Sequence, residues 1–206
     1  NSMASTSLSG KTCLVTGASG FIGSQLCREL SKQGVIVKAL LHSPSDGAWA
    51  LSYPCTLGKE QIPKQAMKDV EVIFHLAGKA HSLAEKRSQI SLYHQTNVEG
   101  TRSLLQAAKD ENVKQIIFFS SVKSMGENSD IRLDEYSEPC PSTPYGKSKL
   151  EAEKLVLDGG YVAFPTVLRL VMVYGNSSKG NFLRMASSMS KNRLPRFPKM
   201  VSKRSI

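Results

Sequence analysis

The sequence predicts a doubly wound α/β fold, in which helices cover both faces of one parallel sheet. Two observations lead to this prediction: short apolar runs alternate with longer helical segments along the chain, and a glycine-rich turn follows the first apolar run. Continuous apolar runs suit strands that are buried on both faces of a parallel sheet. Right-handed crossovers would bring the carboxyl ends of such strands to one edge, where open α/β sheets bind their ligands.

The predicted strands are apolar runs rich in valine, isoleucine, leucine and phenylalanine, side chains that pack well on a buried, pleated surface. In chain order they cover residues 12–16, 35–41, 70–76, 115–119 and 166–170. The segments between them have helical patterns, and the predicted helices cover residues 22–33, 92–112 and 145–157. Beyond Ser177 the pattern weakens: a helix over 181–191 is indicated, and the basic, proline-punctuated stretch 192–206 contains no clear strand.

The composition is that of one globular unit. A chain of 206 residues with 40% hydrophobic and 21% charged residues can bury a single sizeable core. No apolar run approaches the roughly 18 residues of a membrane-spanning helix, so no membrane span is expected. The start of the chain lacks the basic residues and long apolar stretch of a secretory signal, which favours a cytoplasmic location. The 4 cysteines form no C-x-x-C pair, so we expect neither a metal site nor a disulfide framework.

The formal net charge of +10 is concentrated toward the end of the chain. No acidic residue follows Asp158, whereas the basic residues beyond it are Arg169, Lys179, Arg184, Lys191, Arg193, Arg196, Lys199, Lys203 and Arg204. This excess of positive charge is either a solvated surface or an anion-binding region. Because the chain has no nucleic-acid motif and no basic stripe interleaved with aromatic residues, we expect a phosphorylated small ligand rather than nucleic acid.

Residues 16–23 read TGASGFIG, a G-x-x-G-x-x-G turn that ends the first predicted strand and opens into the first predicted helix. Glycine permits the tight turn, lets the backbone approach a pyrophosphate and allows close packing of helix on strand. The helix N-terminus supplies N–H groups and a positive dipole end to the phosphates. The motif therefore predicts a dinucleotide site of the Rossmann type. Its residues are Gly17, Ser19, Gly20, Phe21, Ile22 and Gly23.

Nucleotide choice is normally decided at the end of the second strand, where an acidic residue favours NAD and an arginine favours NADP. Leu41, His42 and Ser43 occupy this region, so neither determinant is present. His42 and Ser43 can donate hydrogen bonds to a phosphate. The sequence therefore leaves NAD and NADP open, with a slight preference for NADP.

Tyr145 and Lys149 are four residues apart and lie on one face of the third predicted helix. An ammonium beside a phenol favours the phenolate and lowers the phenol pKa from about 10 toward the range of a general acid or base. The lysine could also hold the ribose of a nicotinamide. Such a pair is common on helix surfaces, but here it follows the glycine turn and a strand that ends in Ser120 and Ser121. That context favours a catalytic pair.

The chain resembles the extended short-chain dehydrogenases, the NAD-dependent epimerase/dehydratase family, along most of its length. The matching segments are TGASGFIG at 16–23, HLAG at 75–78, NVEGT at 97–101, FSSVKSMGE at 119–127, PYGKSK at 144–149 and LRLVMVYG at 168–175. The resemblance implies that Gly17, Gly20 and Gly23 bind the pyrophosphate. It also implies that Leu76, Ala77 and Gly78 line the cofactor.

The resemblance further implies a catalytic triad of Ser121, Tyr145 and Lys149. Ser121 is favoured over Ser120 because it precedes Gly126 by five residues, as the catalytic serine or threonine does in the family's S-x-x-x-Y-G pattern. Met125 stands where that pattern has tyrosine.

Within the family, the chain looks most like bacterial nucleotide-sugar 4-epimerases and 4-reductases of surface-polysaccharide assembly. This similarity implies hydride transfer between C4 of a UDP- or dTDP-sugar and the nicotinamide, and a homodimer formed by helices 92–112 and 145–157. Asn181 would contact the substrate diphosphate, and the charge of Arg184 and Arg204 suits phosphate binding. A non-catalytic dinucleotide-binding module and a reductase of small carbonyl compounds remain as alternatives.

Extended members of the family complete their sugar site with a C-terminal domain. By this resemblance we expect a dinucleotide-binding domain over 4–178 and the start of a substrate-binding region over 179–206. The C-terminal substrate domain would then be largely missing.

Overall fold

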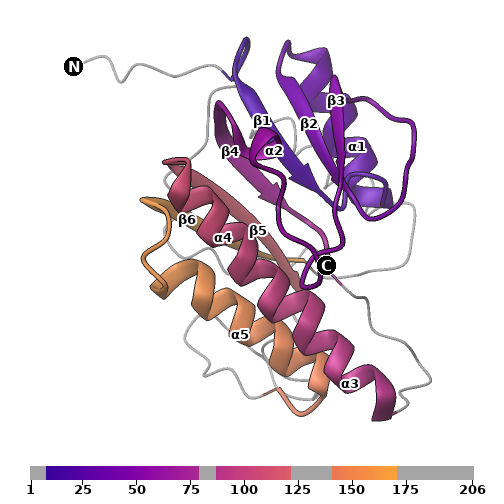
Figure 1. The fold of residues 1–206 in the computed structure, drawn as a ribbon, viewed down its shortest axis with the longest axis vertical. Coiled ribbons are helices and arrows are strands. Elements are labelled where there is room, and N and C mark those ends of the chain that lie inside the picture. The colour runs from indigo at the N-terminus through magenta and orange to yellow at the C-terminus, as the bar shows by residue number, and fades with distance from the viewer. Residues whose placement is uncertain (1–7, 79–86, 122–140, 171–206) are drawn as a thin grey trace, which may run out of the picture.

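The computed structural model describes residues 8–78, 87–121 and 141–170. Within them, six strands form one parallel sheet in the order β3-β2-β1-β4-β5-β6 (Figure 1). The strands are β1 (Thr12–Thr16), β2 (Ile36–Leu41), β3 (Leu51–Pro54), β4 (Val70–His75), β5 (Gln115–Ser121) and β6 (Phe164–Leu170). The helices are α1 (Phe21–Lys32), α2 (Lys64–Met67), α3 (Arg87–Tyr93), the π-helix η1 (His94–Glu99), α4 (Gly100–Asp110) and α5 (Pro144–Asp158). The predicted doubly wound α/β fold is confirmed.

Helices cover both faces of the sheet, because side chains alternate between two apolar clusters along each buried strand. In β1, Cys13 and Val15 join the cluster that packs against α1, whereas Leu14 joins the cluster that packs against α4 and α5. The α1 face includes Leu26, Cys27, Leu30, Val37, Phe74 and Phe119. The opposite face includes Met67, Ile73, Leu104, Leu105, Ile116, Phe118, Ala152 and Val156.

The first strand lies between β2 and β4, so the chain leaves it on one side and later returns on the other. Such a switch in strand order opens a crevice at the carboxyl ends of the two central strands. The register pairs Thr16 of β1 with His75 of β4, and both residues end their strands. The segments that follow, the glycine turn and residues 76–78, therefore lie at the same edge of the sheet.

Sequence patterns missed β3 and the short helix α2. The third strand is an edge strand of 4 residues that is mostly exposed and ends in Pro54, so it has no buried apolar run. Proline is tolerated at a sheet edge because no ladder hydrogen bond is required there. The helical segment predicted at 92–112 also differs: it begins at Arg87 and contains the π-helical turn η1 before α4.

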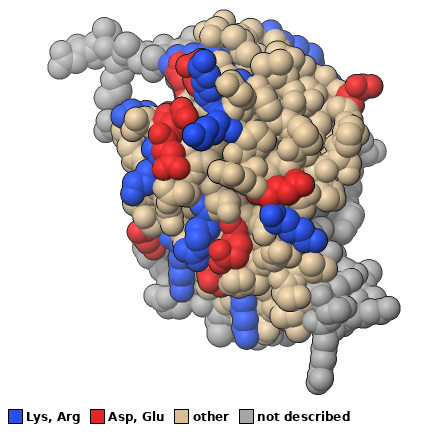
Figure 2. Space-filling view, viewed as in Figure 1, with Lys and Arg blue, Asp and Glu red and all other residues tan. Residues whose placement is uncertain are grey.

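The helices from the two segments 92–112 and 145–157 lie side by side on one face of the sheet, as α4 and α5 (Figure 1). Figure 2 shows this side of the molecule, where described basic and acidic side chains are interspersed rather than separated by sign. Of the basic residues beyond Asp158, the described part of the chain includes Arg169. The proposed domain boundary at 178 lies outside the described residues.

In the ranges 8–78, 87–121 and 141–170, no helix has the length and apolar character needed to cross a bilayer. The same ranges contain no grouping of histidine, cysteine, aspartate and glutamate suited to a metal ion.

Candidate functional site

Two glycines of the turn after β1 are required by the turn itself. Gly17 has a φ of 66°, and a Cβ there would lie 2.7 Å from the backbone nitrogen of Ala77. A Cβ at Gly23, in the first turn of α1, would collide with the carbonyl oxygen of Gly17. Any side chain at either position would displace backbone, so glycine is needed there to bring the helix against the strand.

The middle glycine, Gly20, is different. It is exposed, caps α1 with a φ of −69°, and a Cβ there would meet only the Gly17 carbonyl oxygen, at 3.3 Å. The fold could therefore accept a side chain at Gly20 after a small adjustment. Ser19 and Phe21 are exposed on either side, and Ile22 is half-buried. An open glycine at a helix N-terminus leaves the first-turn N–H groups accessible to an anion.

The loop after β4 joins this turn to the predicted catalytic helix. Thr16 Oγ1 accepts hydrogen bonds from the backbone N–H groups of Leu76 and Ala77, at 3.1 and 3.0 Å. The next residue, Gly78, is exposed, and a Cβ there would lie 3.4 Å from Lys149 Nζ. The structure therefore brings the predicted cofactor-lining residues 76–78 between the glycine turn and Lys149.

The start of α5 positions the predicted catalytic pair. Thr143 caps the helix by accepting a hydrogen bond from the Gly146 N–H at 3.1 Å, and Pro144 occupies the first turn, where its lack of an N–H is harmless. Tyr145 is thus in the first turn, and Lys149 follows one turn later. Lys149 is 5% exposed, and its Nζ lies 4.7 Å from the centroid of the Phe118 ring.

Ser121 ends β5 and shares a side-chain hydrogen bond with Tyr145. Its neighbour Ser120 is also buried, and in the described part of the chain its hydroxyl has no hydrogen-bond partner. The contact with Tyr145 is the reason to keep Ser121 rather than Ser120 in the candidate site.

The expectation that Lys149 lowers the pKa of Tyr145 is wrong for this structure. Burial raises the pKa of Tyr145, and the hydrogen bond from Ser121 lowers it by less. Burial also lowers the pKa of Lys149 to about 8, although the charge of Glu153 opposes this change. Glu153 itself is buried and accepts a 2.7 Å hydrogen bond from Arg169 Nη2. At Tyr145 desolvation outweighs the hydrogen bond from Ser121, and at Lys149 it outweighs the attraction of Glu153.

Sequence patterns did not assign a role to Asn97, which the structure places in the site. Asn97 is 2% exposed in the π-helical turn η1, and its Oδ1 lies beside Gly78. Its Nδ2 donates to Ser148 Oγ at 3.0 Å, and Ser148 Oγ donates to the Tyr145 carbonyl at 2.8 Å. The available signal was its position at the start of the NVEGT segment.

His42 lies just beyond β2 at the same edge of the sheet, exposed, with its Nδ1 3.1 Å from Thr56 Oγ1. Its Nε2 edge can therefore face a ligand while Thr56 holds the ring. The proposed substrate residues Asn181, Arg184 and Arg204 lie outside the described residues.

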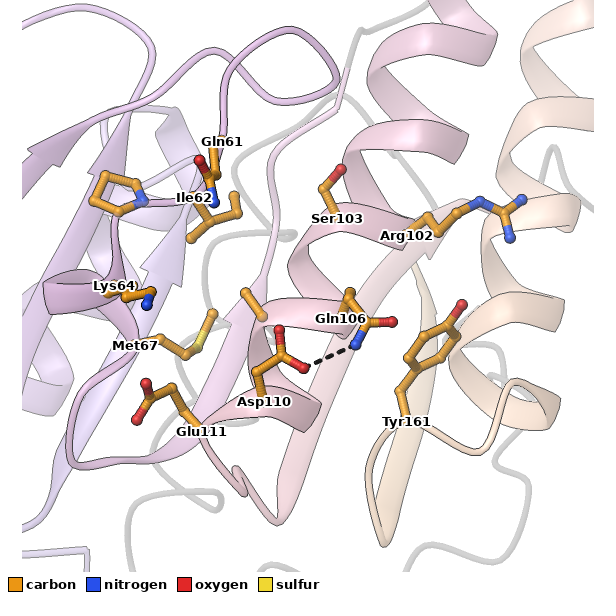
Figure 3. Close-up of a pocket in the computed structure, with 12 residues that line it drawn as sticks. Gln61, Ile62, Lys64, Met67, Arg102, Ser103, Gln106, Asp110, Glu111 and Tyr161 are labelled. Carbon is orange, nitrogen blue, oxygen red and sulfur yellow. Dashed lines mark hydrogen bonds between the residues drawn. The ribbon is translucent and has the colours of Figure 1, made fainter.

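A separate groove of about 410 Å³ lies between the loop before α2 and the outer side of α4 (Figure 3). Its lining residues include Ile62, Met67, Gln106 and Tyr161. Gln106 donates a hydrogen bond to Asp110 at 2.9 Å. The groove contains none of the predicted site residues.

Comparisons with known proteins agree on one family. The model of the NAD-dependent epimerase/dehydratase family matches residues 13–200. A UDP-glucose 4-epimerase from Vibrio cholerae is 32% identical over 190 residues, which are 88% of this chain and 57% of that protein.

Two solved structures have a similar fold. A short-chain dehydrogenase/reductase superfamily protein from Agrobacterium tumefaciens with bound NAD is 31% identical, with a TM-score of 0.68 over 77% of this chain and 48% of the other. A UDP-glucose 4-epimerase from Thermotoga maritima with UDP-glucose is 30% identical, with a TM-score of 0.65 over 77% of this chain and 54% of the other. The chain therefore spans about half the length of these relatives.

Proposed function

We propose that this chain, which belongs to the NAD-dependent epimerase/dehydratase family, binds NAD or NADP and carries the catalytic residues of an oxidoreductase that acts at C4 of a nucleotide-activated sugar. One observation carries the proposal: the glycine turn, residues 76–78 and the Ser121, Tyr145 and Lys149 side chains converge at one edge of the sheet. The relatives named as UDP-glucose 4-epimerases support the sugar and the carbon atom.

The residues at this edge suit a dinucleotide. The open backbone at Gly20 and the N-terminus of α1 would hold the pyrophosphate, and residues 76–78 would line the nicotinamide end. When bound, the nicotinamide would accept or supply the hydride. Tyr145 would exchange the proton of the C4 hydroxyl at its phenolic oxygen, Ser121 would position the sugar oxygen, and Lys149 would hold the ribose.

The Tyr145 phenol beside Ser121 argues against a non-catalytic dinucleotide-binding module. The Lys149 ammonium would suit ribose binding in either kind of protein, whereas a module that only binds the dinucleotide would not need a proton-exchanging hydroxyl hydrogen-bonded to Ser121. Perturbed pKa values such as those of Tyr145 and Lys149 gather at functional sites.

NAD is the nucleotide bound in the Agrobacterium relative, whereas the hydrogen-bond donors of His42 and Ser43 are our reason for slightly favouring NADP. We propose UDP-sugars and dTDP-sugars as alternative substrates. The two reactions that we propose are epimerisation at C4 and reduction of a 4-keto group. The cytoplasmic location stays a prediction.

Gly20→Val is expected to remove dinucleotide binding without removing the fold. A ligand that binds only the native state adds RT ln(1 + [L]/Kd) of stability, about 2.7 kcal/mol at a hundredfold excess over Kd. In the parent chain, NAD or NADP should therefore raise the melting temperature. The variant should melt close to the ligand-free parent and show no rise, because the valine blocks the approach of the pyrophosphate.

Gly23→Val is the matched comparison in the same turn. Its Cβ would collide with the Gly17 carbonyl, so this variant should lose stability with or without ligand. Equal ligand-induced shifts in Gly20→Val and the parent would contradict the proposed cofactor site. The same melting assay with UDP- and dTDP-sugars tests the substrate class, and a response only to small carbonyl compounds would favour the alternative reductase.

We also propose a homodimer through the outer sides of α4 and α5. The structure narrows the apolar residues available for it, because Leu104, Leu105, Ala108 and Val156 are buried in the core. Leu150 is only partly buried, and Leu157, seven residues later on the same side of α5, is 39% exposed.

A dimer is therefore expected by light scattering at micromolar concentration, and Leu150→Arg combined with Leu157→Arg should shift it to a monomer. Phe164→Arg is the control, because Phe164 is an exposed apolar residue of a strand rather than of these helices, with 63% of its surface exposed at the start of β6. A monomeric parent would contradict the proposed interface.

A further inference from the structure

His75, the last residue of β4, is fully buried and has a hydrogen-bond partner at each ring nitrogen. Its Nδ1 lies 2.7 Å from Thr16 Oγ1, and its Nε2 lies 2.8 Å from Thr101 Oγ1. The ring stacks on Phe118 with 5.1 Å between centroids. Through its two ring nitrogens, His75 thus connects β1, which precedes the glycine turn, to α4.

The neighbours of His75 decide which ring nitrogen carries the proton. Thr16 Oγ1 already accepts two N–H groups, from Leu76 and Ala77. A hydroxyl oxygen has two lone pairs and one hydrogen, so Thr16 must donate that hydrogen to Nδ1 of His75. Nδ1 is therefore an acceptor and carries no proton.

The hydrogen bonds around Nε2 lead independently to the same tautomer of His75. Thr101 Oγ1 donates its hydrogen to the carbonyl oxygen of Asn97 at 2.7 Å. It can then only accept from His75, so Nε2 must carry the proton. With this neutral tautomer, each hydrogen bond in the chain Leu76/Ala77–Thr16–His75–Thr101–Asn97 has one donor and one acceptor.

We propose that His75 is a positioning residue, held as the neutral Nε2–H tautomer, that fixes the cofactor-lining loop 76–78 relative to the helices that carry Asn97 and Tyr145. The link continues beyond Asn97, whose side chain donates to Ser148, which in turn donates to the Tyr145 carbonyl. The proposal rests on the proposed function of this edge as a dinucleotide site.

The surroundings of His75 keep this link unchanged near neutral pH. Burial lowers the pKa of His75 to about 3, and the positive charge of Lys149 adds to the effect. An imidazolium would also have to donate to Thr16, whose oxygen has no remaining lone pair. His75 therefore serves as a fixed hydrogen-bonding connector rather than as a proton-transfer group.

Thr101 offers a test from outside the cofactor pocket. Thr101→Val keeps the shape of the side chain but leaves the Nε2–H of His75 without its acceptor, whereas Thr101→Ser keeps the hydroxyl. We expect Thr101→Val to weaken dinucleotide binding by about tenfold or more and Thr101→Ser to change it by less than about threefold. Ile116→Val is the control. It removes a buried methyl group from β5 and so lowers stability, but it leaves the hydrogen bonds of Thr16, His75 and Thr101 intact.

Nitrogen-15 NMR of the ligand-free 206-residue chain reports on the same link without any cofactor. The parent and Thr101→Ser should show His75 as a neutral Nε2–H imidazole from pH 5 to pH 8. In Thr101→Val, the amide resonances of Leu76 and Ala77 should move, although neither residue neighbours Thr101 in the sequence. An imidazolium or an Nδ1–H tautomer in the parent would overturn the proposal.

Equal losses of dinucleotide affinity in Thr101→Val and Ile116→Val would also overturn it, because the effect would then follow stability alone. If the parent binds no dinucleotide, the proposed function fails, whereas the imidazole spectrum and the two amide resonances still decide whether His75 holds the loop. The two failures are therefore distinguishable.

Discussion

Tyr145→Phe is expected to slow any oxidation or reduction at C4 by about 10²- to 10⁴-fold, the usual contribution of a general acid or base, while leaving dinucleotide affinity within about twofold. Phenylalanine keeps the ring, which contacts Tyr93 edge-on at 5.7 Å between centroids, and removes only the hydroxyl that meets Ser121. The measurements are turnover of UDP-glucose in an enzyme form that contains this chain, and the Kd of the dinucleotide.

The pH dependence of the parent should follow the raised pKa of Tyr145. Oxidation needs the phenolate as base, so its rate should increase with pH across the neutral range and beyond. Reduction needs the protonated phenol, which predominates there, so its rate should change little. Tyr93→Phe is the matched control for the loss of a nearby buried phenol. A similar loss of turnover in both variants would remove Tyr145 from its proposed role.

Lys149→Met is expected to abolish turnover and, at the same time, to stabilise the protein. The burial that lowers the pKa of Lys149 from 10.5 to about 8 disfavours its charged form in the folded state. At about 1.4 kcal/mol per pKa unit, removing the charge should raise the free energy of unfolding at pH 7 by about 3 kcal/mol. That corresponds to a melting temperature several degrees higher for a chain of this size.

Methionine suits this test because its flexible side chain can fill the space beside the Phe118 ring. Glu153 keeps its hydrogen bonds from Arg169, so the substitution does not strand a buried charge. Lys147→Met, at an exposed position on the same helix, should change stability by less than about 0.5 kcal/mol.

The difference in the free energy of unfolding between Lys149→Met and the parent should decrease as the pH rises above 8. Between pH 8 and 10.5 the unfolded parent binds more protons at Lys149 than the folded parent, so the parent gains stability as the pH rises through this range. The variant has no such group, and the difference between the two should shrink toward pH 10.5. Below pH 8 the difference should be constant. A variant less stable than the parent at pH 7 would contradict the account of Lys149 as a residue kept for function at the expense of stability.

The sequence by itself determined the features that depend on short stretches of chain. Buried parallel strands appear as continuous apolar runs, so strands β1, β2, β4, β5 and β6 were predicted with small shifts at their ends. The turn at 16–23 and the spacing of Tyr145 and Lys149 are local patterns, and they were sufficient to propose the cofactor site and the catalytic pair. The edge strand β3 lacks a buried apolar run and left no such pattern.

Only the tertiary structure decided how those local features act together. Thr16 and His75 are 59 positions apart, and the tautomer of His75 depends on hydrogen bonds from two further elements. Burial reversed the expected direction of the Tyr145 pKa, and the packing placed Leu104 and Leu105 in the core but left Leu157 exposed. These properties follow from desolvation and from contacts between residues distant along the chain. Spacing and composition can place Tyr145 beside Lys149, but the charge state of each depends on how much water the fold excludes from around it.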